Sequence, residues 1–321
     1  MNEHPTPSAS TVLDAAARIA GHATLTPVLQ SGVLDALAGA RLLFKAEHLQ
    51  RGGAFKFRGA CNAVWALSAQ QAAAGVVTHS SGNHGAALAL AARSRGIACH
   101  VVVPEGAVAA KLANISRHGA QLWRCAPSIA AREALCAQVQ ADTGAYLVHP
   151  YANAEVIAGQ GTAALELIQS APLPLDVLVV PVGGGGLAAG SALALQQASP
   201  GTRLVLAEPS GAADTARSLA AGERRVDFTP DTVCDGLRGT LGAPNFAILQ
   251  AAAAEVITVD DDATVAAMRL LWQVLKQVVE PSSAIALAAV LAQPQRFAGL
   301  RVGIVLSGGN VDIDALPWGR P

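Results

Sequence analysis

The sequence VLVVPVGGGGLAAG, residues 177–190, joins an apolar run to a run of small residues through four consecutive glycines. The apolar run is typical of a strand, and the residues after Gly186 favour a helix. Four glycines at this junction let successive backbone N–H groups point toward an anion, and the positive end of the helix dipole favours a phosphate there. A plain tight turn is the alternative, although each glycine costs conformational entropy on folding. The stretch therefore predicts a strand, a phosphate-binding turn and a helix.

The same alternation of strands and helices extends through most of the chain. Helical patterns end at Gly75, Gly96, Gly119 and Gly144, where glycine adopts the left-handed conformation of a helix C-terminus at little cost. Each of these glycines is followed by a run predicted to be a strand, at 76–79, 97–103, 120–124 and 145–149. Further strands are predicted at 41–46, 176–182, 203–207, 255–259 and 301–306. This spacing predicts βαβ units and parallel, doubly wound sheets.

The alternation divides into two blocks. Residues 75–150 predict one small α/β domain, and residues 151–321 predict a second with longer helices. A chain of 321 residues is long for one compact core, which agrees with this division. The N-terminal segment carries an amphipathic helix at 12–19 and a strand at 41–46, and the pattern leaves open which domain it packs on.

The composition is that of a globular protein, with 52% apolar residues and a formal net charge of −1. The chain lacks the basic excess of a protein that binds nucleic acid or an anionic membrane. Its apolar runs near 177–195 and 284–292 are interrupted or too short to span a bilayer, and the first ten residues have no signal-peptide pattern. The five cysteines have no CxxC pairing, as expected of buried thiols in a reducing compartment. We expect a soluble cytoplasmic protein.

One lysine has an unusual setting, in the sequence GGAFKFRGA at residues 52–60. Helical spacing of Phe57, Cys61, Val64 and Leu67 predicts a buried face, and Lys56 lies one position from it. Burial disfavours the charged ammonium and lowers the pKa, and a free amine forms an imine with a carbonyl. The alternative is a lysine whose stem lies along the core while its ammonium reaches water.

Open parallel sheets bind ligands at the carboxyl ends of their strands, and three further strand ends carry polar residues. The strand at 76–79 leads into Ser80-Ser81-Gly82-Asn83-His84-Gly85, whose hydroxyl, amide and N–H groups at a helix start would hold a carboxylate. Ordinary helix capping is the alternative for this loop. The strand at 301–306 leads into Ser307, in a glycine-rich turn that lets a ligand approach the backbone.

The strand at 203–207 ends at Glu208, and Asp214 follows six residues later. Two carboxylates in one turn, with help from backbone carbonyls, suit a hard divalent cation. A solvated loop is the alternative.

Two interpretations of these strand ends compete. Gly183, Gly185 and Ala188 satisfy G-x-G-x-x-G/A, and Glu208 ends the next strand, which is typical of a dinucleotide-binding oxidoreductase that uses NAD. In the other, the glycine turn holds the phosphate of pyridoxal phosphate and Lys56 carries its aldehyde as an imine. Only this second interpretation gives Lys56, Asn83 and Ser307 a role.

With these residues in place, the chain resembles the fold-type II pyridoxal-phosphate family of serine/threonine dehydratases and serine racemases over nearly its whole length. The resemblance rests on seven blocks that occur in the family's order: GAFKFRGA (53–60), SSGNHGAALALAA (80–92), VIAGQGT (156–162), VVPVGGGGLAAG (179–190), AEPSGAAD (207–214), EPSSA (280–284) and LSGGNVD (306–312). It implies the tryptophan synthase β-like α/β fold, with two doubly wound parallel-sheet domains. Residues 1–74 and 151–321 would form the large cofactor-binding domain and residues 75–150 the small one.

The resemblance also implies roles for individual residues. Lys56 would be the Schiff-base lysine, with Phe55 beside the ring, Asn83 on the 3-hydroxyl group and Ser307 on the ring nitrogen. The rest of the cofactor site would be Gly183, Gly184, Gly185, Gly186, Leu187, Gly236 and Glu280. The substrate α-carboxylate would be held by Ser80, Ser81, Asn83 and His84.

The implied reaction is β-elimination of water from serine, threonine or 3-hydroxyaspartate, which gives a 2-oxo acid and ammonia. Lys56 would remove the α-proton, and a neutral hydroxyl at the ring nitrogen favours elimination over transamination. A second carboxylate on the substrate needs a cation, for which Arg132 is preferred to His84 and Arg238. Arg132 as a solvated charge on the predicted helix at 128–141 is the alternative.

Other features resemble the serine racemases within the family, so racemisation with side dehydratase activity is the alternative function. Ser81 matches their proton-transferring serine on the ring face opposite the lysine. Glu208, the carbonyl of Ala212 and Asp214 match their divalent-cation site, for Mg²⁺, Mn²⁺ or Ca²⁺. Ala86 replaces a glutamine near the nucleotide site of animal racemases, and Gly239-Thr240 replaces a Ser-Ser pair. The family also implies a homodimer.

Overall fold

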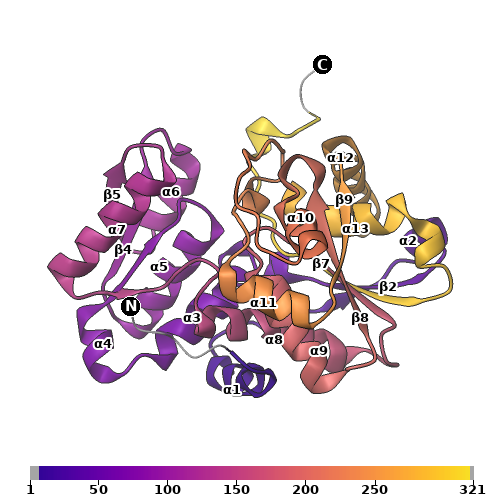
Figure 1. Ribbon diagram of the computed structural model, residues 1–321, viewed down its shortest axis with the longest axis horizontal. Helices are drawn as coiled ribbons and strands as arrows, with labels where there is room; N and C mark the ends of the chain where they lie inside the picture. The colour runs from indigo at the N-terminus through magenta and orange to yellow at the C-terminus, as the bar shows by residue number, and fades with distance from the viewer. Residues whose placement is uncertain (1–6, 319–321) are drawn as a thin grey trace.

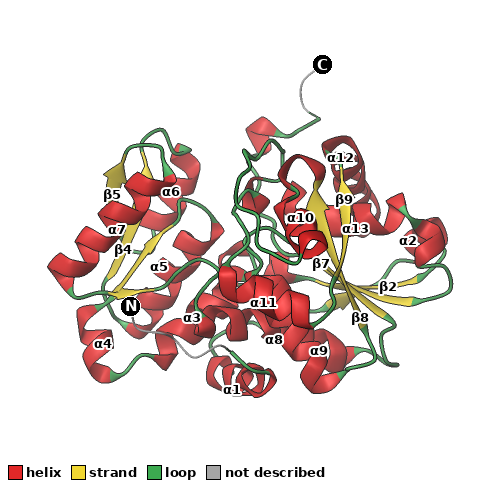
Figure 2. Cartoon of the chain, in the orientation of Figure 1, coloured by secondary structure: helices red, strands yellow, loops and turns green. Residues whose placement is uncertain are grey.

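The computed structural model describes residues 7–318, and its strands form two sheets (Figures 1 and 2). In spatial order, the larger sheet contains β1 (Val28–Leu29), β2 (Arg41–Lys45), β10 (Arg301–Val305), β7 (Val177–Pro181), β8 (Arg203–Pro209) and β9 (Glu255–Val259). The smaller contains β5 (Gln121–Cys125), β4 (Cys99–Pro104), β3 (Val76–His79) and β6 (Tyr146–Leu147). All neighbouring strands are parallel except β1 and β2, so the predicted parallel α/β fold is confirmed, with an antiparallel edge strand added.

Helices cover both faces of both sheets (Figure 2). In chain order they are α1 (Ala9–Ile19), α2 (Gly32–Ala38), α3 (Lys56–Ala66), α4 (Ala69–Ala74), α5 (Asn83–Arg95), α6 (Ala109–Ser116), α7 (Ile129–Thr143), α8 (Ala154–Ser170), α9 (Gly186–Ala198), α10 (Asp214–Ala221), α11 (Ala243–Ala251), α12 (Asp261–Leu270) and α13 (Pro281–Ala292). Among residues 7–318, no helix has both the length and the apolar character needed to cross a bilayer.

Strand β7 explains why the larger sheet is covered on both sides. Val177 and Val179 lie in the core beneath α12 and α13, whereas Leu178 and Val180 lie in the core beneath α8 and α9. Successive side chains of a strand point to opposite faces, so an uninterrupted apolar run requires two apolar layers. In the smaller sheet, the side chains of β4 alternate in the same way, with α3 and α5 on one face and α7 on the other.

All four predicted glycine joints lie between a helix and a strand and have positive φ, and two of them close a left-handed helix cap. Gly96 and Gly144 cap α5 and α7 in the left-handed conformation, with φ of 72° and 70°. Gly75 has φ 82° but an extended ψ of −167°, because its backbone turns directly into β3 beside Ala98. Gly119 lies two residues beyond the C-cap of α6. The strand after it begins at Gln121, and β6 is reduced to two residues.

The N-terminal segment adds strands to the larger sheet and packs a helix against the smaller one. Strands β1 and β2 extend the larger sheet, whereas the buried face of α3, with Phe57, Cys61 and Val64, lies in the same core as β3, β4 and α5. The pattern that predicted this face from helical spacing is confirmed. The domain boundaries at residues 75 and 150 remain a prediction. The five cysteines are buried free thiols, as predicted.

Candidate active site

Lys56 is the first residue of α3, and contacts from distant segments fix its position. The N–H of Phe55 donates to the carbonyl of Ser307 at 2.9 Å, which ties the helix start to the carboxyl end of β10. The Nζ of Lys56 donates to the carbonyl of Pro150 at 3.0 Å and lies 5.0 Å from the centroid of the Phe55 ring. Burial lowers the pKa of Lys56 to about 8, and the charge of Glu280 opposes this shift. Lys56 as a whole is half-buried, and its lowered pKa agrees with the desolvated amine expected from the sequence.

The glycine turn between β7 and α9 forms a cradle free of side chains. Gly185 has φ 87°, and the first turn of α9 leaves backbone N–H groups without carbonyl partners within the helix. A Cβ on Gly183 would lie 2.7 Å from the Cα of Leu237, and a Cβ on Gly184 would lie 2.4 Å from the ring of Tyr151. Only glycine therefore fits at these two positions.

Asn245 of α11 is hydrogen-bonded to this turn. Its Nδ2 donates to the carbonyls of Tyr151 at 3.0 Å and Gly184 at 2.5 Å. The residue before Tyr151 accepts the hydrogen bond from Lys56, so one short segment joins the lysine to the glycine turn. Free N–H groups, a helix start and a nearby buried amine match the phosphate and aldehyde ends of pyridoxal phosphate. The residues present therefore fit this cofactor.

A hydrogen-bonded network lies between Asn83 and the turn after β10. Asn83, the first residue of α5, donates from Nδ2 to the two carboxylate oxygens of Glu280 at 3.0 and 3.2 Å. Asn310 donates from Nδ2 to Oδ1 of Asn83 at 2.9 Å and from its backbone N–H to Glu280 at 3.1 Å. Burial, followed by the charge of Asp235, raises the pKa of Glu280 to about 7. The network joins the start of α5, which follows β3 of the smaller sheet, to the turn after β10 of the larger sheet.

Ser307 and Gly236 lie at the edge of this network. Ser307 is 3% exposed, and its Oγ lies 3.5 Å from the carbonyl of Ser282. Gly236 donates its N–H to Oγ of Ser282 at 3.0 Å. The structure thus brings Gly236, Glu280 and Ser307 to one place, as the resemblance implied for the cofactor site. Their roles toward the cofactor remain predictions.

The predicted substrate residues follow β3. Ser80 and Ser81 are partly buried in the loop before α5, whereas His84 is 2% exposed. Burial, followed by the charge of Lys56, lowers the pKa of His84 well below its ordinary value. A neutral His84 does not supply a cation for a second carboxylate. Its Nε2 lies 3.2 Å from the carbonyl of Val148.

The two candidate arginines differ in their contacts. Arg238 directs its guanidinium to the carbonyl of Thr232, at 2.6 Å from Nη2. Arg132 is half-buried in the first turn of α7, close enough that its charge, after burial, contributes to lowering the pKa of His79. His79 is the last residue of β3 and directly precedes Ser80. This favours Arg132 over Arg238 as the cation beside the predicted substrate site.

The predicted cation ligands lie at the carboxyl end of β8. Both oxygens of Glu208 accept backbone N–H groups, from Thr215 at 2.7 Å and Ala216 at 2.9 Å. Burial raises the pKa of Glu208 to about 7 and raises the pKa of Asp214. Oδ2 of Asp214 accepts the N–H of Leu241 at 2.8 Å, and Oδ1 has no partner within residues 7–318. Two buried carboxyl groups with an unpaired oxygen suit a cation.

Among residues 7–318, no group of three or more histidine, cysteine or acidic residues is arranged to hold a metal ion. The same geometry weakens the dinucleotide interpretation. Glu208 is fully buried and its oxygens are used by the first turn of α10, so neither faces a ribose hydroxyl.

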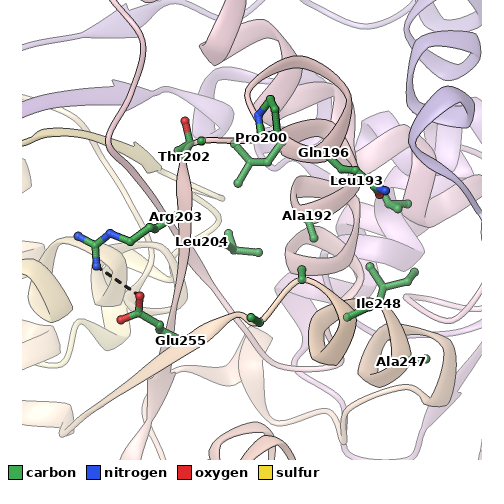
Figure 3. Close-up of a pocket in the computed structure, with 15 residues that line it drawn as sticks. Ala192, Leu193, Gln196, Pro200, Thr202, Arg203, Leu204, Ala247, Ile248 and Glu255 are labelled. Atoms are coloured by element: carbon green, nitrogen blue, oxygen red, sulfur yellow. Dashed lines mark hydrogen bonds and ion pairs between the residues drawn. The ribbon is translucent and has the colours of Figure 1, made fainter.

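A cavity of about 660 Å³ lies at the opposite end of the larger sheet (Figure 3). The second half of α9, α11 and the amino ends of β8 and β9 line it, with Leu193, Leu204 and Ile248 on its apolar side. Arg203 and Glu255 form an ion pair at its rim, at 3.3 Å. Ligands of parallel sheets bind at the carboxyl ends, so this cavity is not the predicted site.

Three residues that shape the site were not predicted from the sequence: Tyr151, Asn245 and Asn310. Tyr151 and Asn245 lie outside the seven sequence blocks, in a connection after β6 and in α11, and no spacing signals their contact with the glycine turn. Asn310 lies within the SGGN turn, where the block itself was the available signal.

Comparison with known proteins agrees with this geometry. The family model described as "Pyridoxal-phosphate dependent enzyme" matches residues 19–308. A beta-hydroxyaspartate dehydratase of Paracoccus denitrificans (strain Pd 1222) is 47% identical, over 97% of this chain and 99% of its own length. A serine racemase of Oryza sativa subsp. indica is 45% identical, over 95% of this chain and 91% of its own.

The solved structure of maize serine racemase aligns with a TM-score of 0.93 at 43% identity, and covers 96% of this chain and 95% of that one. Residues 19–308, which the family model matches, include the strands of both sheets, Lys56 and the glycine turn. The chain belongs to the family of pyridoxal-phosphate dependent enzymes.

Proposed function

We propose that the enzyme removes water from a 3-hydroxy amino acid by β-elimination and releases a 2-oxo acid and ammonia. The observation that carries the proposal is the buried amine of Lys56, with a pKa of about 8, beside a glycine cradle and a neutral serine. Its substrates would be serine, threonine or 3-hydroxyaspartate. The 47% identity to a beta-hydroxyaspartate dehydratase places 3-hydroxyaspartate first for testing.

Lys56 is the proposed base. Bound pyridoxal phosphate supplies an electron sink that makes the substrate α-proton acidic. A lysine of pKa about 8 is neutral in a substantial fraction of molecules near neutral pH, so its Nζ accepts that proton without prior deprotonation by another group. The Phe55 ring and the Pro150 carbonyl hold the amine at one end of the cradle.

Asn83 and Ser307 would orient the cofactor ring. Asn83 would bind the 3-hydroxyl group through its amide, and Glu280 accepts hydrogen bonds from Nδ2 of this amide through both carboxylate oxygens. The hydroxyl of Ser307 is neutral and does not hold a proton on the ring nitrogen as a carboxylate would. A weaker electron sink favours loss of the β-hydroxyl group over longer-lived carbanion chemistry.

The substrate would bind through its carboxylates. Ser80, Ser81 and the start of α5 present hydroxyl and N–H donors for the α-carboxylate. Arg132 would bind the second carboxylate of 3-hydroxyaspartate, which serine and threonine lack. An Arg132→Gln variant would therefore raise KM for 3-hydroxyaspartate about tenfold or more, with little change for serine.

Serine racemisation is the second candidate, favoured by Ser81 and by the 43–45% identity to serine racemases. Racemisation needs a second proton-transfer group on the ring face opposite Lys56, and Ser81 is proposed for that role. A Ser81→Ala variant separates the two functions. It would lose D-serine formation while it keeps elimination, whereas loss of both activities would assign Ser81 to binding alone.

We also propose a structural divalent cation, Mg²⁺, Mn²⁺ or Ca²⁺, held by Glu208, Asp214 and the carbonyl of Ala212. The unpaired Oδ1 of Asp214 and the repulsion between two buried carboxylates support it. A homodimer in the cytoplasm, with a small amino acid as partner rather than nucleic acid or membrane, follows from the family resemblance and the net charge of −1. Sedimentation velocity would test the dimer.

The direct test supplies L-serine, L-threonine and L-threo-3-hydroxyaspartate separately to the purified protein and follows 2-oxo acid formation. Fastest release from 3-hydroxyaspartate supports the proposed substrate. Chiral analysis of serine in the same reactions measures racemisation. Absence of oxo acid from all three substrates would contradict the dehydratase proposal.

A further inference from the structure

Gln160, in the middle of α8, carries a carboxamide whose hydrogen-bonding groups are unused. The residue is fully buried, and neither Nε2 nor Oε1 has a hydrogen-bond partner among residues 7–318. Burying an unsatisfied amide is costly, and most buried polar side chains in proteins are paired. A glutamine in this position therefore indicates a partner that is not one of the described residues.

The carboxamide lies between the two elements that build the proposed cofactor site. A Cβ on Gly59, one turn after Lys56 in α3, would lie 2.9 Å from Nε2 of Gln160. A Cβ on Gly186, the first residue of α9, would lie 3.1 Å from Oε1. The side chain therefore spans from the lysine helix to the first turn of the glycine cradle.

Close helix packing holds Gln160 in this place. Its neighbour Gly159 packs against α3, where an added Cβ would lie 2.8 Å from the Cα of Gly59. Its other neighbour, Gly161, packs against α9, where an added Cβ would lie 2.4 Å from the carbonyl of Gly190. Because both neighbours are wedged between helices, the backbone of Gln160 has little freedom to turn the carboxamide away.

We propose that Gln160 is a positioning residue for the phosphate group bound at the first turn of α9. Its amide N–H donates to a phosphate oxygen, directly or through one ordered water. A half-turn of the terminal torsion exchanges Oε1 and Nε2, which brings the donor to the side of Gly186. The site is thus more than a helix N-terminus, because a buried donor is aimed into it. This inference rests on the proposed use of pyridoxal phosphate.

The test compares pyridoxal phosphate with pyridoxal, which has the same aldehyde and lacks the phosphate. Both are titrated into cofactor-free protein and followed by visible absorption and by quenching of tryptophan fluorescence. Gln160→Met keeps the length and volume of the side chain and removes its donor. We expect about tenfold weaker binding of pyridoxal phosphate and unchanged binding of pyridoxal, the loss that one charge-assisted hydrogen bond produces.

Gln160→Glu is the second variant. It keeps the shape and places a carboxylate beside the phosphate, so it should weaken pyridoxal phosphate binding more than methionine does. The matched control is Ser191→Ala, which removes a buried hydroxyl that also has no partner and lies in α9, five residues after Gly186. Its binding of both compounds should equal that of the wild type. Circular dichroism and the unfolding midpoint of each cofactor-free variant report its folding.

The ³¹P NMR shift of the bound cofactor gives a readout independent of affinity. It should move in Gln160→Met holoenzyme and stay in place in Ser191→Ala. Equal loss of pyridoxal phosphate and pyridoxal binding, or no loss of either with an unmoved ³¹P signal, would overturn the role of Gln160. A wild-type protein that binds neither compound would instead overturn the proposed function itself.

Discussion

The pH dependence of cofactor capture by Lys56 follows directly from its burial. A pKa of about 8, in place of the ordinary 10.5, changes the fraction of neutral amine. At about pH 7.5 roughly a quarter of the molecules carry a neutral amine, against about one in a thousand for an exposed lysine, a difference of about 200-fold. The rate of capture should therefore rise through pH 8 and level off near pH 9.

Removing the charge of Glu280 tests this pH dependence. This carboxylate raises the pKa of Lys56, against the larger effect of burial. Its own pKa of about 7 means that it is ionised over the range in which Lys56 titrates. Glu280→Gln removes the charge and nearly keeps the shape. The titration midpoint of Lys56 should therefore move to lower pH, and capture at pH 7 should become faster.

The assay mixes cofactor-free protein with pyridoxal phosphate in a stopped-flow instrument and follows the visible band at a series of pH values. A model alkylamine in the same buffers corrects for the titration of the reagent itself. A rate that climbs beyond pH 9.5 would refute the desolvation of Lys56. A midpoint that moves upward in Glu280→Gln would refute the assigned direction of its charge effect.

Three further outcomes follow from the structure. In Gly184→Ala the new Cβ would lie 2.4 Å from the Tyr151 ring, so the variant should bind pyridoxal phosphate at least about tenfold more weakly. The control Gly201→Ala has open space at its Cβ and should keep the wild-type affinity. Equilibrium titration measures both affinities. Arg58→Met leaves buried carboxylates without their cation and should reduce the free energy of unfolding by about 3–5 kcal/mol, measured by urea denaturation. A chelator should lower the unfolding midpoint of the wild type and leave the midpoint of Glu208→Gln unchanged. A cation present at 100 times its Kd would raise the free energy of unfolding by about 2.7 kcal/mol.

The pattern of apolar residues and the positions of glycines were sufficient to predict the fold class. Uninterrupted apolar runs such as 177–182 predicted strands with two covered faces, and glycines marked the helix ends. The errors lie where tertiary contacts decide the local conformation. Gly75 bends into β3 beside Ala98 rather than closing a left-handed cap, and the short strand β1 has no pattern that distinguishes two residues from a loop.

The candidate site was predictable where one residue has an unusual local setting, as Lys56 does. It was not predictable where function depends on contacts between distant segments. Asn83 and Asn310 are 227 residues apart in the chain, and their hydrogen bond joins a segment after β3 of the smaller sheet to a segment after β10 of the larger sheet. Tyr151 packs against the glycine turn, and the side-chain amide of Asn245 donates to the carbonyls of both Tyr151 and Gly184. Residue spacing in the sequence does not indicate either contact.

The most direct test of the account compares the wild type with Lys56→Ala in one experiment. Visible absorption spectra of the purified proteins are recorded, and 2-oxo acid release from L-threo-3-hydroxyaspartate is followed in the same cuvettes. We expect a yellow wild type that releases oxo acid, and a variant that has lost both the colour and the release. A colourless wild type that is stabilised by NAD, or a Lys56→Ala variant that releases oxo acid at the wild-type rate, would contradict it.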